Sequence, residues 1–156
     1  MQRFKNILCI INTGVKDNTV LDHAVKLASN SQARLTVVEV IDDTQAKEKS
    51  LEDIFSLESL QKKLVTDHEN ALLELISPWT NKLKINHKVL TGILFLEVIR
   101  EVLRDGYDLV FKMSDSGGLL NRVFGSDDMH LLRKCPCPVW LVKPESPKTY
   151  KRTNVY

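Results

Sequence analysis

The chain has 156 residues, of which 43% are hydrophobic and 27% charged, with a formal net charge of +2. This balance is typical of one globular domain; it excludes a disordered chain, and so small a net charge argues against a nucleic-acid partner. The sequence has neither an apolar run long enough to span a membrane nor the start of a secretion signal. We therefore expect a cytoplasmic protein with no membrane partner.

The first half of the sequence alternates strand-like and helix-like segments. A short apolar run over residues 4–11 predicts a buried strand, and a helical pattern follows over residues 17–31. Residues 34–41 are rich in β-branched side chains and predict a second strand. The polar residues 42–50 predict a loop.

The second half continues this alternation. A long helix is predicted from about residue 51 to Ser77, where Pro78 stops it. The next strand, over residues 84–90, is the most polar and is therefore expected at an edge of the sheet. The remaining predicted elements are a helix over 95–103 closed by Asp105-Gly106, a strand over 107–112, a helix over 126–134 and a strand over 139–142.

Strands that alternate with helices at this spacing predict a parallel sheet wound on both faces by right-handed crossovers. We expect a single-domain, Rossmann-like α/β fold of three layers, with a doubly wound five-stranded parallel sheet in the order 3-2-1-4-5. A ligand of such a sheet binds at the carboxyl ends of the strands. Residues 12–17, 40–43 and 113–126 are therefore expected around one crevice.

The loop before the last helix has features of a phosphate site. Gly125-Ser126 leads directly into that helix, where backbone N–H groups and the helix dipole attract an anion. The Ser126 hydroxyl is also placed to cap the helix. The glycine spacing matches neither the P-loop nor the Rossmann dinucleotide pattern, so the loop alone does not define a nucleotide site.

Three segments carry a family resemblance: ILCIINTG at the first strand, VVEVID at the second, and FGSDDMHLLRKCPCPVWLVKP near the C-terminal end. With the alternating architecture, they resemble the universal stress protein family over residues 4–144. The C-terminal segment is similar in particular to the N-terminal half of E-type universal stress proteins, which carry two such domains in tandem. The resemblance implies a non-enzymatic stress-response module whose domain covers residues 1–144.

Nucleotide-binding members of this family carry G-x-x-G, nine further residues and G-[ST] in the loop, with an aspartate after the first strand. When the G-[ST] pair is aligned, the first two glycine positions fall on Lys112 and Asp115, and the aspartate position falls on Asn12. The position whose backbone contacts adenine falls on Val40. Because only the backbone makes this contact, any residue can occupy the position. The resemblance therefore implies a degenerate nucleotide-binding loop.

The acidic residues of the loop also argue against phosphate. The two aspartates of the helix's first turn already complement the helix dipole, and Asp115 adds a negative charge nearby. We therefore expect no ATP or AMP cofactor bound in the family's usual way. The alternative is an adenine-nucleotide switch with a shifted loop, in which Gly117 and Gly118 approach the phosphates with Lys112 or Arg122.

Cys135 and Cys137 flank Pro136 in a C-x-C pattern, without the second ligand pair of a zinc site. In an extended segment both thiols would face the same side of the chain. We interpret them as small apolar residues at the entry to the last strand; the alternative is a thiol-based sensor. With Cys9 they make an odd number, as expected of free thiols in a reducing compartment.

The histidines do not suggest a catalytic set. His68 lies on the apolar stripe of the long helix and is expected to be hydrogen-bonded at the edge of the core. His130 is expected to line the crevice or to cover the sheet near Trp140, and His23 and His87 to face solvent. No Ser/His/Asp or paired-carboxylate spacing can be argued from the sequence, so we expect no enzymatic activity and no metal.

The last strand has apolar residues on both faces, with Val139 and Leu141 on one and Trp140 and Val142 on the other. An apolar edge of this kind tends to be covered or paired. The resemblance implies pairing with a second subunit, as a homodimer, or with a tandem second domain. The alternative is an ordinary buried strand.

Residues 145–156 are expected to form a polar tail, or the start of a linker or second domain. Residues 149–152 echo residues 3–6, which lead into the first strand. One hypothesis from this echo is that the chain is the first half of a tandem protein; the alternative is a frayed tail.

Overall fold

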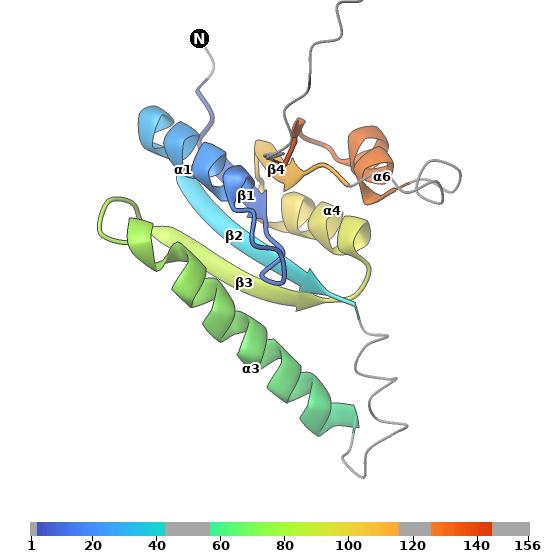
Figure 1. Cartoon of the computed structure of the whole chain (residues 1–156). Coiled ribbons are helices and arrows are strands. Elements are labelled where there is room, and N and C mark those ends of the chain that lie inside the picture. The colour runs from blue at the N-terminus through green and yellow to red at the C-terminus, as the bar shows by residue number, and fades with distance from the viewer. Residues whose placement is uncertain (1–2, 43–56, 116–125, 145–156) are drawn as a thin grey trace, which may run out of the picture.

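A computed structural model of the chain describes residues 3–42, 57–115 and 126–144. These residues form a parallel sheet of five strands in the order β3-β2-β1-β4-β5 (Figure 1). The predicted fold class, the strand order and the edge position of the third strand are confirmed. The strands are β1 Asn6–Ile10, β2 Arg34–Ile41, β3 Ile85–Thr91, β4 Leu109–Met113 and β5 Val139–Val142. The helices are α1 Thr19–Ser31, α3 Leu57–Ile76, α4 Leu94–Asp105 and α6 Asp127–Lys134, with a 3-10 turn, η1, over Ser77–Trp79.

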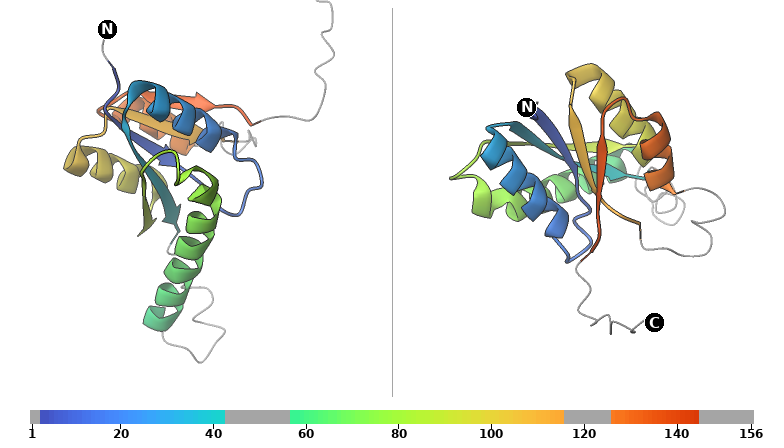
Figure 2. Two further views of the ribbon diagram at one scale, coloured as in Figure 1. Left: turned by 90° about the vertical axis from the view of Figure 1, so that its left-hand side faces the viewer. Right: turned by 90° about the horizontal axis from the view of Figure 1, so that it is seen from above.

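Helices cover both faces of the sheet (Figure 2). On one face, α1 and α3 bury their apolar stripes against alternate strand residues, as shown by Leu21, Leu72 and Phe111, each at most 1% exposed. On the other face, α4 and α6 do the same through Val98 and Leu131, both fully buried. No helix among the described residues is long and apolar enough to cross a membrane.

The ends of the helices follow the predicted signals. Gly106 closes α4 in the left-handed conformation, with φ at 69°, and its N–H donates to the carbonyl of Val102 at 2.9 Å. The α-helical part of α3 ends at Ile76, and one 3-10 turn carries the chain through Pro78. The predicted start of this helix at residues 51–56, most of the loop before it and the tail over 145–156 lie outside the described residues.

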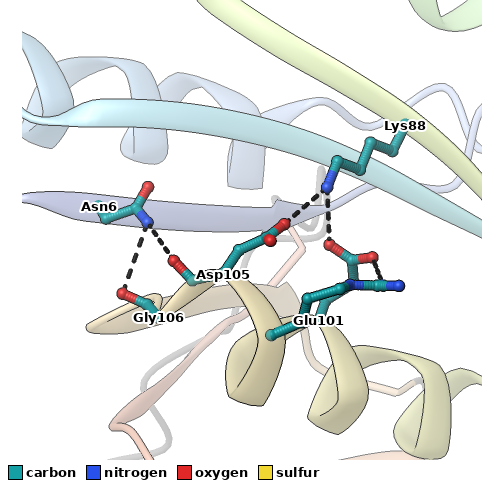
Figure 3. A network of polar contacts seen from close by, with 6 residues as sticks. Asn6, Lys88, Glu101, Asp105 and Gly106 are labelled. Carbon is teal, nitrogen blue, oxygen red and sulfur yellow. Dashed lines mark hydrogen bonds and ion pairs between the residues drawn. The ribbon is translucent and has the colours of Figure 1, made fainter.

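An ion-pair network ties α4 to the edge strand β3 (Figure 3). The Lys88 ammonium lies 3.0 Å from Glu101 and 2.7 Å from Asp105. Arg104 also pairs with Glu101, whose side chain is 1% exposed and needs such partners. The hydrogen bond from Lys88 lowers the pKa of Asp105 below its ordinary value. On the other side, the Asn6 amide donates to the Asp105 carbonyl at 3.2 Å, which joins α4 to β1.

Candidate functional site: a crevice at the carboxyl ends of the strands

A cavity of about 580 Å³ lies where β1, β2 and β4 end. The three segments predicted around one crevice contribute to its wall, and four predicted site residues line it: Asn12, Val40, Lys112 and Asp115. The predicted Gly117, Gly118 and Gly125 lie outside the described residues, as does Arg122. The sequence pattern therefore brings these four residues together at one end of the sheet, as parallel topology requires.

Lys112 forms a buried cluster with two carboxylates at this end of β4, which we call the Lys112 cluster (Lys112, Asp115 and Asp128). The Lys112 Nζ lies 2.8 Å from Asp115 Oδ1 and 2.7 Å from Asp128 Oδ1. It also donates to the Met113 carbonyl at 3.0 Å. Lys112 and Asp128 are only 6% and 8% exposed. Burial opposes the charge on Lys112, but the two carboxylates outweigh it and the pKa of Lys112 is raised.

Asp128 occupies the donors that an anion would need. Its second oxygen, Oδ2, accepts the backbone N–H of Asp115 at 2.7 Å, while Oδ1 accepts from Lys112. One carboxylate therefore takes both an ammonium and a loop amide, which are the donors that typically hold a phosphate oxygen. The Lys112 side chain therefore points inward, toward Asp128.

The N-terminus of α6 stands beside the cluster. Ser126 is the N-cap, and its Oγ accepts the N–H of Met129 at 3.4 Å, so the predicted cap is confirmed. Asp127 follows it and lines the cavity. Burial, and then the nearby charge of Asp115, raise the pKa of Asp127. The positive end of the helix dipole is thus already faced by carboxylates from within the chain.

Asn12, which follows β1, turns its side chain into its own loop. Its Oδ1 accepts the Gly14 N–H at 2.9 Å, and its carbonyl accepts the Val15 N–H at 3.1 Å. The side-chain oxygen therefore stabilises the turn after β1.

Glu39 is a buried carboxylate of the crevice that the sequence analysis missed. It is 4% exposed, and it pairs with His68 Nδ1 of α3. It also accepts from the Thr13 N–H at 2.5 Å and from the Thr13 hydroxyl at 2.9 Å. A single glutamate inside the apolar run RLTVVEVI was the available signal, because a buried charge requires a partner. His68 is hydrogen-bonded at the edge of the core, as predicted.

This second cluster has the wrong geometry for a proton relay. Thr13 and Glu39 both contact the same ring nitrogen of His68, whereas a nucleophile–histidine–carboxylate relay uses both nitrogens. Its contacts join the loop after β1 to β2 and α3. Within the described part of the chain, no group of three His, Cys, Asp or Glu side chains is arranged to hold a metal ion.

Two other predicted positions differ from expectation. His130 neither lines the crevice nor covers the sheet near Trp140; its ring stacks on Phe95 of α4, with centroids 4.2 Å apart. Cys135 and Cys137 do not lie in an extended segment, because the backbone bends at Pro136 and Cys137. His23 and His87 face solvent, as predicted.

Among the described residues, the last strand, β5, is the second edge of the sheet and pairs with β4 alone. Trp140 is 52% exposed, although its ring stacks on the buried Phe111 with centroids 5.3 Å apart. Val142 is buried and Val139 and Leu141 are half-buried. The edge therefore combines an exposed indole with an apolar strand.

Comparison with known proteins identifies the family. A sequence model of the universal stress protein family matches residues 3–143. The chain belongs to the universal stress protein family. It is 29% identical to universal stress protein E of Escherichia coli (strain K12) over 165 aligned positions, which cover 99% of this chain and 51% of that protein. The chain thus spans about half the length of the curated relatives it matches.

Solved structures of the family share the fold. A universal stress protein family member from Burkholderia pseudomallei superposes with a TM-score of 0.67 at 20% identity, covering 91% of this chain and 98% of that one. A member from Arabidopsis thaliana, determined with AMP bound, gives a TM-score of 0.56 at 15% identity, covering 95% and 97%. At these identities the likeness extends to the fold and not to the ligand.

Proposed function

We propose that the chain is a cytoplasmic, non-enzymatic stress-response module whose crevice does not bind ATP in the usual way of the universal stress protein family. Family membership supports the stress-response role. The observation that carries the statement about ATP is the Lys112 cluster, which fills the phosphate end of the crevice with a carboxylate of the chain itself.

The energetic argument rests on charge. A phosphate placed here would have to displace Asp128 from Lys112 and from the Asp115 amide, both at 2.7 Å. It would also face the carboxylates of Asp115 and Asp127. Two like charges 4 Å apart repel by about 4 kcal/mol at an effective dielectric of 20. Because the phosphate would only replace hydrogen bonds that Asp128 already makes, it gains no net hydrogen bonds to offset this repulsion.

The second candidate function is an adenine-nucleotide switch. Three observations favour it: a cavity of about 580 Å³ suits a small ligand, Val40 lies in its wall, and a structural relative was determined with AMP bound. In this chain such a switch requires Asp128 to leave Lys112, since the phosphates need those donors.

Native mass spectrometry of the purified protein, followed by thermal melting with Mg-ATP, distinguishes the two candidate functions. We expect no stoichiometric adenine nucleotide and no rise in melting temperature at millimolar Mg-ATP, since only a ligand that binds the folded state stabilises it. A matched variant, Asp115→Gly with Asp128→Asn, frees Lys112 and is expected to gain a Mg-ATP-dependent rise. Co-purified nucleotide at one per chain in the wild type would establish the switch instead.

We further propose that the module acts through pairing of its β5 edge, with a second copy or with a tandem second domain. The exposed Trp140 and the apolar edge support this. Sedimentation of the wild type and of Trp140→Glu tests pairing with a second copy. A dimer that becomes a monomer in the variant agrees with pairing through β5. A dimer that persists unchanged in Trp140→Glu rules out this edge.

A further inference from the structure

Cys135 and Cys137 form a close thiol pair at the joint between α6 and β5. Their sulfur atoms lie 3.7 Å apart, and neither takes part in a disulfide. Both side chains are half-buried and pack against the core cluster beneath α4 and α6. The pair lies at the amino end of β5, away from the crevice at the carboxyl ends.

The backbone holds the two thiols together. On one side, the Cys135 N–H donates to the Leu131 carbonyl at 2.9 Å, which ends α6. On the other side, the Pro138 carbonyl accepts the Val110 N–H at 3.0 Å, which starts the pairing of β4 with β5. The ring of Pro136 restricts the bend between them. Because both ends are anchored, the backbone keeps the two cysteines close together.

A neighbouring hollow opens on the Cys137 side of this pair. The hollow has a volume of about 910 Å³, and Cys137 lies in its wall between Pro136 and Pro138. Arg3 and Lys5 also line it and supply positive charge. The carboxylate of Asp108, the acidic group of this wall, already accepts the N–H groups of Lys5 and Asn6 at 2.7 and 3.1 Å. The hollow therefore suits a small thiol compound that carries carboxylates.

We propose that Cys135 and Cys137 are a redox-active dithiol, oxidised to an intramolecular disulfide by exchange with an oxidised low-molecular-mass thiol of the glutathione class. A disulfide needs sulfur atoms about 2.05 Å apart, so the two sulfurs must approach each other from 3.7 Å. The proposal is independent of what the crevice binds.

The reaction proceeds in two exchange steps. The Cys135 thiolate attacks one sulfur of the small disulfide, which breaks the S–S bond, forms a mixed disulfide and releases one small thiolate. Cys137 then loses its proton to solvent, and its sulfur attacks Cys135 Sγ, which releases the second small thiolate. The released thiolates equilibrate with the solvent protons. Two electrons pass from the cysteine pair to the small disulfide, which becomes two thiols.

The protonation of the pair supports this division of roles. The hydrogen bond between the two sulfurs, opposed in part by burial, lowers the pKa of Cys135 to about 6. The same hydrogen bond, together with burial, raises the pKa of Cys137. A lowered pKa on one thiol and a raised pKa on the other is the arrangement that an attacking and a resolving cysteine require. Cys9 is fully buried, and burial raises its pKa, so it serves as an internal unreactive thiol.

The test equilibrates the full chain in glutathione buffers of increasing oxidised fraction, quenches with acid, and alkylates the remaining thiols. Mass spectrometry of the tryptic peptide that begins at Cys135 is expected to show loss of about 2 Da and no alkylation, while Cys9 stays reduced. The disulfide is expected to be at least about tenfold more stable, relative to glutathione, in the folded chain than in guanidinium chloride. The Cys137→Ala variant is expected to stop at a glutathione adduct on Cys135, and the midpoint of its alkylation–pH profile should rise from near 6.

Three results would overturn the proposal. The first is a peptide with two free thiols at every buffer ratio in a chain that keeps its native circular dichroism. The second is a pair of glutathione adducts without the internal disulfide, and the third is equal disulfide stability in the folded and denatured chains. The wild-type measurements decide these outcomes even where Cys137→Ala does not fold.

Discussion

Two lysine–carboxylate clusters lie on the same face of the sheet, one with a solvent-exposed lysine and the other with a buried lysine. In the first cluster, the Lys88 side chain is 39% exposed and pairs with the buried Glu101, with Arg104 as a second cation. In the Lys112 cluster, the single lysine is itself buried and holds two carboxylates beside a cavity. The first cluster joins elements at an edge, whereas the second fills a place where a ligand would bind.

The largest expected effect is the loss of the buried lysine. Lys112→Met keeps the length of the side chain but leaves Asp128 without its cation in a site only 8% exposed. Removing one partner of a buried ion pair lowers the free energy of unfolding by about 3 kcal/mol. Urea unfolding followed by circular dichroism measures this loss in the free energy of unfolding. A loss below about 1 kcal/mol would mean that the cluster stabilises the fold no more than an exposed ion pair does, and would contradict this account.

A double variant tests whether the unpaired charge of Asp128 causes this loss of stability. Lys112→Met with Asp128→Leu removes the lysine and the more buried of its two carboxylates, while Asp115, whose side chain is 28% exposed, stays hydrated. Apolar replacement of a buried pair is close to neutral. We expect the double variant to regain at least half of the stability that Lys112→Met loses, in the same urea assay. If the double variant is less stable than Lys112→Met, the unpaired charge of Asp128 is not the cause of the loss.

The smallest effect is expected at the edge cluster. Lys88→Met leaves Glu101 paired with Arg104, and solvent screens the half-exposed Lys88, so the loss is at most about 1 kcal/mol. Because Lys88 lowers the pKa of Asp105, this contribution is fully present above the unfolded pKa of 3.8 and is lost as the pH falls through the lower folded value. Urea unfolding at a series of pH values should show the two proteins converging only at acidic pH. A difference that grows on acidification would contradict this assignment.

Much of the fold follows from the order of patterns in the sequence. Apolar runs alternate with helical stripes, and this order alone predicts a parallel sheet with the polar 84–90 segment at an edge. The ends of elements were predictable where a specific residue determines them, as Gly106 does for α4. The β1 strand is shorter than its apolar run, since Phe4 packs at the edge of the core without strand pairing.

The site was predictable only as a set of positions. Spacing places Asn12, Val40 and Lys112 at the same end of the sheet, but the direction of a side chain depends on helix rotation and on packing. The contact of Lys112 with Asp128 spans 16 residues, and that of Glu39 with His68 spans 29, so neither follows from local pattern. The bend between Cys135 and Cys137 also depends on the anchors at both ends of the segment.

The most direct test of the central claim compares adenosine with Mg-ATP, because the two share a base and ribose and differ in the phosphates. NMR-detected titration of the full chain gives both dissociation constants in one assay. If the Lys112 cluster closes the crevice to phosphate, Mg-ATP binds no more tightly than adenosine. Binding of Mg-ATP tenfold tighter or more, a gain of about 1.4 kcal/mol from the phosphates, would contradict the account.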